Sequence, residues 1–133
     1  MFNILKRITV VGFIGAIMIM IASCGDNIIT DPSEIVFPDS NVSYKSHVLP
    51  LLSLSCAYIG CHNDESAAGN LRLTSHIAMF QHTGLIIRFK PDNSVLIQTI
   101  EGTLPHRATY RQDFNVNQKK GMRMWVLEGA KDN

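Results

Sequence analysis

The pattern of hydrophobic and polar positions divides the 133-residue chain into three parts. Residues 8–22 form an apolar run that only one threonine and two glycines interrupt. Residues 25–43 are mostly polar and rich in turn-forming residues, and from about Tyr44 onward short apolar stretches recur to the end of the chain. This pattern predicts a leader segment, a linker and one small domain, mostly α-helical, over residues 44–133.

The domain's helices are predicted from apolar residues at helical spacing. A first helix leads into Cys56, and Pro50 either begins or kinks it. A helical turn through Met79 and Phe80 is capped by Thr74 or Ser75, and a short helix from residue 95 is capped by Asn93 or Ser94. The last helix runs roughly from residue 117 to residue 129, and its apolar stripe consists of Gln118, Met122, Trp125, Val126 and Gly129.

The leader has the features of a secretory signal. Lys6 and Arg7 precede the apolar run, which is shorter than the roughly 20 residues that a membrane-spanning helix needs. The run ends in Ile-Ala-Ser-Cys-Gly at residues 21–25, which resembles the lipobox of bacterial lipoproteins. This resemblance implies a signal peptide over residues 1–23 and a lipid anchor on Cys24, although an uncleaved N-terminal anchor is an alternative. In both cases the domain leaves the cytoplasm.

The linker that follows, residues 24–43, is predicted to be a flexible tether between the lipid and the domain. Turn formers and polar residues dominate it, but interspersed aliphatic pairs are able to dock on the domain.

Removing the two basic residues of the leader changes the formal charge of the chain from +1 to −1. No basic stripe remains, so nucleic-acid binding is not expected.

The residues from Cys56 to His62 carry the most specific chemistry in the chain. Two cysteines followed directly by a histidine are typical of the attachment site of a c-type haem. The two thiols would form thioethers to the haem vinyl groups, and His62 would be the proximal iron ligand. Four residues separate the cysteines instead of the usual two, and Gly60 makes the required outward bulge easier. A Cys56–Cys61 disulfide and a zinc site are alternatives, although no second Cys/His pair follows at zinc-finger spacing.

Several short motifs together resemble the planctomycete-type cytochrome c domain over about residues 44–131. They are Val-x-Pro-Leu-Leu before Cys56, Cys61-His62, Gly-Asn-Leu-Arg-Leu at 69–73, Pro-Asp-Asn-Ser-Val-Leu at 91–96 and Trp-Val-Leu-Glu-Gly-Ala at 125–130. The resemblance implies a mostly α-helical domain whose N- and C-terminal helices pack together around one covalently bound haem c. It also implies a one-electron carrier, not an enzyme, that serves redox partner proteins of the bacterial cell envelope, facing the periplasm or the outer surface.

The sixth iron position departs from this family. The family usually has Met-Pro before the last helix, whereas this chain has Leu104-Pro105, and leucine has no donor atom. His106 is therefore the expected second ligand. A methionine (Met122 or Met124), another histidine (His47, His76 or His82) and an open site are alternatives, and the open site would suit a five-coordinate haem sensor. Without haem, the chain would be a small disulfide-containing lipoprotein with a binding or structural role.

Overall fold

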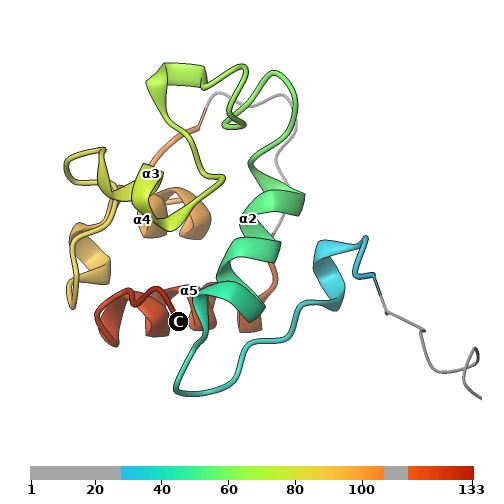
Figure 1. Cartoon of the computed structure of the whole chain (residues 1–133). Coiled ribbons are helices and arrows are strands. Elements are labelled where there is room, and N and C mark those ends of the chain that lie inside the picture. The colour runs from blue at the N-terminus through green and yellow to red at the C-terminus, as the bar shows by residue number, and fades with distance from the viewer. Residues whose placement is uncertain (1–27, 107–113) are drawn as a thin grey trace, which may run out of the picture.

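The computed structural model describes residues 28–106 and 114–133, and this part of the chain contains helices and no strands. The expected signal peptide and Cys24 lie outside the described residues. The α-helices are α2 (Leu49–Ser55), α3 (His76–Phe80), α4 (Val95–Glu101) and α5 (Val116–Leu127), which Figure 1 shows with α5 across the lower part of the molecule. The shorter helical turns are η1 (Pro32–Glu34), η2 (Tyr44–Val48), η3 (Ala68–Asn70) and η4 (Pro91–Asn93). The mostly α-helical prediction is confirmed.

The first predicted helix consists of two different segments. The π-helical turn η2 begins at Ser43, whose side chain accepts a hydrogen bond from the Ser46 N–H. The regular helix α2 then starts at Leu49, with Pro50 in its first turn. Proline is tolerated there because the first N–H groups of a helix have no intrahelical partner. Pro50 therefore begins the α-helix and does not kink it.

The last helix starts at a reciprocal capping box. The Asn115 side chain accepts a hydrogen bond from the Gln118 N–H at 2.9 Å, and the Gln118 side chain accepts one from the Asn115 N–H at 3.1 Å. This arrangement satisfies two N–H groups that a helix start otherwise leaves without partners. The buried face of α5 contains most of the predicted stripe and also Gly121.

The first helical segment and α5 pack against each other, as expected. Tyr44 and Trp125 stack with ring centroids 5.8 Å apart and an interplanar angle of 27°. The fully buried core around them includes Leu51, Met79 and Met122. Met79 and Met122 are thus core residues, which is the usual role of a methionine on an apolar stripe.

Residues 32–42, which we call the strap, pack against α5. The side chains of Ile35, Phe37 and Val42 are at most 3% exposed. The structure differs here from the flexible tether expected over residues 24–43, because these apolar side chains are buried and the Phe37 ring lies against Gly121 of α5. The packed unit therefore begins by Pro32 and not near Tyr44.

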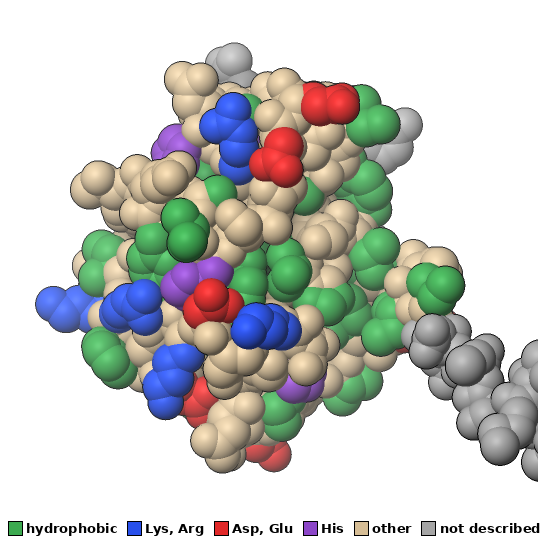
Figure 2. All heavy atoms as spheres, viewed as in Figure 1, with side chains coloured by type: hydrophobic (Ala, Val, Ile, Leu, Met, Phe, Trp, Pro, Cys, Tyr) green, Lys and Arg blue, Asp and Glu red, His purple; other side chains and the backbone are tan. Residues whose placement is uncertain are grey.

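The surface of the described residues carries charges of both signs. On the face shown in Figure 2, Lys and Arg side chains lie close to Asp and Glu side chains, with hydrophobic side chains between them. Arg123, for example, forms ion pairs with Asp92 and Glu101. In residues 28–106 and 114–133, no helix has both the length and the apolar character needed to cross a membrane.

Candidate functional site

The loop that carries the two cysteines turns back on itself directly after α2. Cys56 is the C-terminal cap of that helix, and its carbonyl accepts a hydrogen bond from the His62 N–H at 3.2 Å. Gly60 has a φ angle of +85°, which few residues other than glycine adopt, and its N–H donates to the Ser66 hydroxyl at 2.7 Å. Ile59 is 87% exposed. The two extra residues between the cysteines are therefore accommodated by an outward bulge.

This loop forms one wall of a cavity of about 270 Å³. Residues 71–73, α4, residues 104–106 and the start of α5 form the other walls. Cys56, Cys61 and His62 all line the cavity, and most of the remaining lining is aliphatic, contributed by Leu71, Leu73, Leu85, Val95, Leu96, Ile100 and Leu104. The structure thus brings the three residues of the motif together at an apolar pocket.

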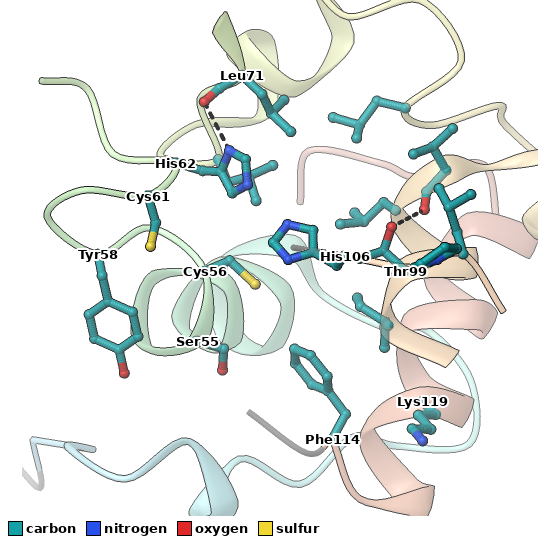
Figure 3. Close-up of a pocket in the computed structure, with 17 residues that line it drawn as sticks. Ser55, Cys56, Tyr58, Cys61, His62, Leu71, Thr99, His106, Phe114 and Lys119 are labelled. Carbon is teal, nitrogen blue, oxygen red and sulfur yellow. Dashed lines mark hydrogen bonds between the residues drawn. The ribbon is translucent and has the colours of Figure 1, made fainter. Parts of the chain in front are cut away.

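His106 also lines the cavity and faces His62. The centroids of the two imidazole rings are 5.8 Å apart, and the ring planes are tilted by 60° (Figure 3). The two residues come from segments that are far apart in the sequence, so the fold itself creates this pair. The position expected for the second ligand is therefore occupied by a nitrogen donor on the cavity wall.

A hydrogen bond from the loop orients the ring of His62. Its Nδ1 lies 3.4 Å from the carbonyl oxygen of Leu71, which can only accept, so Nδ1 carries the proton. The lone pair is then on Nε2, the atom that is free to bind a metal. Burial lowers the pKa of His62, and the nearby His106 adds to this effect. The imidazole is consequently neutral at neutral pH, which is the form that ligates metals.

Both cysteines are free thiols in the structure, which does not contain the Cys56–Cys61 disulfide. Burial raises the pKa of Cys56 to about 12, with a further contribution from Cys61. A thiol with such a pKa stays protonated, whereas zinc binding and disulfide exchange use the thiolate. No group of three or more His, Cys, Asp or Glu side chains that could hold a metal ion occurs in the described part of the chain.

The other candidate histidine ligands are bound elsewhere. The Nε2 of His76 donates to the Ala130 carbonyl at 2.9 Å, and that of His82 is hydrogen-bonded to the Asn70 carbonyl. The ring of His47 contacts the backbone of Ser43. None of these three histidines lines the cavity.

The methionine candidates lie away from the cavity as well. Met122 is fully buried in the core, and Met124 packs against that core. No methionine is among the described residues that line the cavity. Leu104 lines it at the position where the family usually has methionine.

Four lining residues have polar side-chain groups that the sequence analysis did not identify: Ser55, Tyr58, Thr99 and Lys119. The hydroxyl oxygen of Ser55 is buried and has no hydrogen-bond partner among the described residues. Lys119 is on the first turns of α5, and no local pattern in the sequence identifies it as a cavity residue. In Figure 3 Ser55 and Lys119 lie below the two histidines, with Phe114 between them.

The residues present fit a covalently attached haem. The cavity has two free thiols and one imidazole on a single wall, a second imidazole facing the first, and an otherwise mostly apolar lining. A family model described as Planctomycete cytochrome C matches residues 59–108, which include Cys61, His62 and His106 but not Cys56. No curated protein and no solved structure matches the chain.

Proposed function

We propose that the chain carries single electrons on one haem c at the bacterial cell envelope, because a family model described as Planctomycete cytochrome C matches residues 59–108. Haem binding and electron transport in general follow from the family. The observation that carries the more specific proposal is the pair formed by His62 and His106, which face each other beside two free thiols.

The motif residues would hold the haem from one side. Cys56, at the end of α2, and Cys61, in the turn that follows, each supply one sulfur for a thioether bond. His62 supplies the proximal nitrogen, and its hydrogen bond to the Leu71 carbonyl keeps the ring oriented. The bound haem supplies the one-electron chemistry by changing the oxidation state of its iron.

His106, which faces His62 across the cavity, would supply a second nitrogen ligand. Two nitrogen ligands leave no open site on the iron, and they favour electron transfer at a lower potential than a methionine ligand does. The apolar lining would surround a bound haem with a medium of lower dielectric constant than water. These features suit a carrier and not an enzyme, because no position is left for a substrate on the metal.

The envelope location is supported by the sequence. The leader and the Ile-Ala-Ser-Cys motif would place the domain outside the cytoplasm, with Cys24 as the lipid-bearing residue. The electron donors and acceptors would then be redox proteins of the same compartment.

The decisive experiment is expression together with a c-type maturation system. The protein should be red and should retain its haem on a denaturing gel, because thioether bonds survive denaturation. Cys61→Ser should weaken or abolish covalent attachment, and His62→Ala should change the absorption spectrum. His82→Ala, which is outside the cavity, serves as the matched control and should leave both properties unchanged. A colourless wild-type protein with a Cys56–Cys61 disulfide would contradict the proposal.

A further inference from the structure

The strap, residues 32–42, is held to α5 at three points along its length. The Gln118 side chain donates a hydrogen bond to the Pro32 carbonyl at 2.6 Å. Asn117 accepts from the Phe37 N–H at 2.8 Å and donates to the Phe37 carbonyl at 2.9 Å. The two carboxylate oxygens of Glu128 accept from the backbone N–H groups of residues 41 and 42, at 2.6 and 2.9 Å. The strap is therefore bound by side chains from one end of α5 to the other.

Apolar contacts close the same interface. The ring of Phe37 lies on Gly121, where a Cβ atom would come within 2.2 Å of the Phe37 side chain. Ile35 and Val42 are buried on either side of it in the sequence. Opening the strap would expose three large apolar side chains and leave the buried amide of Gln118 without an acceptor. The closed strap is thus part of the folded domain.

We propose that the strap holds the haem domain close to the lipid surface by shortening its connection to the anchor. This inference rests on the lipid anchor at Cys24 proposed above. With the strap closed, only residues 25–31 connect the anchor to the domain, and seven residues span at most about 25 Å. A free tether over residues 25–43 would span up to about 65 Å.

The closed strap does not obstruct the site. None of its residues lines the cavity. The cavity walls come from the loop with the two cysteines, residues 71–73, α4, residues 104–106 and the start of α5. The domain can therefore be kept at the membrane while the cavity stays accessible.

The test measures how close the haem lies to the bilayer. The acylated holoprotein is reconstituted in phosphatidylcholine vesicles that contain a lipid with a fluorescent headgroup, which the haem quenches by energy transfer. One variant carries a twelve-residue Gly/Ser insertion between Thr30 and Asp31. A second variant, Phe37→Ser with Asn117→Ser, opens the strap. Val36→Ser is the matched control, because Val36 is adjacent to Phe37 but 70% exposed.

Wild type and the Val36→Ser control should quench strongly, and the two other variants should lose quenching several-fold. Protease cleavage within residues 32–42, with an unchanged haem spectrum, shows independently that the strap has opened. If the insertion variant or the opened variant quenches as strongly as wild type, the proposal is overturned. Should the opened variant fail to fold, the insertion variant decides alone, since it leaves every strap contact in place.

The experiment distinguishes failure of the inference about the strap from failure of the proposed function. If wild type does not float with the vesicles, the anchor and this inference both fail, while haem binding is unaffected. If the protein is colourless, haem binding fails, and the distance is then measured from Trp125, the only tryptophan of the chain, to a dansyl-labelled lipid. In that measurement too, weaker energy transfer in the insertion variant than in wild type supports the proposal, and equal energy transfer overturns it.

Discussion

Phe37 lies directly on the backbone of Gly121. A Cβ atom at residue 121 would be 2.2 Å from both Cβ and Cγ of Phe37, a separation that real atoms do not tolerate. Residue 121 is helical, so glycine is required there by the close approach of the strap and not by its backbone angles.

Gly121→Ala should destabilise the domain, because the new methyl group must displace the buried Phe37 ring. Overpacking of this kind costs about 1–3 kcal/mol, which denaturant titration of the free energy of unfolding measures. Combining it with Phe37→Gly should cost less than the sum of the two single variants, since only glycine at residue 37 removes both the Cβ and the ring that the new methyl group meets. Lys120→Ala is the control, and it should change stability little, because it loses only a solvent-exposed ion pair with Asp39. Additive costs for Gly121→Ala and Phe37→Gly would contradict this account.

Gln118→Glu should reduce stability as well. The amide of Gln118 both accepts from the Asn115 N–H and donates to the buried Pro32 carbonyl. A glutamate keeps the acceptor but cannot donate when ionised, and it places a charge next to a carbonyl oxygen. The Pro32 carbonyl would keep only the hydrogen bond from the Ile35 N–H, and losing the other bond while burying a charge should cost about 1–3 kcal/mol. Equal unfolding midpoints for the variant and wild type at neutral pH would show that this hydrogen bond contributes nothing.

His106→Ala should open the iron to an added ligand. Removing the second imidazole leaves one axial position empty, so the reduced variant should bind carbon monoxide, whereas wild type and His82→Ala should not. The oxidised wild-type protein should also lack the weak near-infrared band of iron–methionine ligation. If His106→Ala keeps the wild-type spectrum and Met122→Leu or Met124→Leu alters it, a methionine is the ligand.

Alkaline pH should destabilise the protein through Tyr44. Burial raises the pKa of its phenol from about 10 to about 12. Between these two values the unfolded chain releases the phenolic proton while the folded chain retains it, so stability falls as pH rises. Tyr44→Phe should remove this part of the pH dependence. It should cost little at neutral pH, because the Tyr44 hydroxyl is buried and has no partner among the described residues. Identical pH profiles for the variant and wild type would refute the assignment.

The helices and the motif were predictable because they depend on local signals. Helical spacing, Pro50 and the Asn115 capping box act within a few residues, and the cysteine motif is contiguous. Ser75 likewise caps α3 as its sequence suggests. Ser94 shows the limit of such reasoning. It precedes α4, as predicted, but its hydroxyl accepts from the Ile87 N–H at 2.9 Å and donates to carbonyls of the preceding turn instead of capping the helix.

The features that the sequence did not reveal depend on contacts between distant segments. The strap looked like a linker because its polar residues dominate its composition, while the face that binds it is more than 70 residues away. Nothing in the local pattern around Gly121 identifies Phe37 as its neighbour. Ser55 and Lys119 are ordinary residues until the fold places them at the cavity.

The hydrogen bonds around the cysteine motif have a consequence for the order of assembly. The backbone groups of Cys61 and His62 bind Tyr58, Cys56, Ala68 and Leu73, so all their partners lie within a dozen residues. Contacts between residues so near in the sequence require the closure of only short loops, and they therefore form early in folding. The position of His106 depends instead on long-range packing. We expect a nascent chain to present a nearly complete attachment loop while its last helix is still being made, so that the haem could be joined first and serve as the surface on which the remaining segments condense.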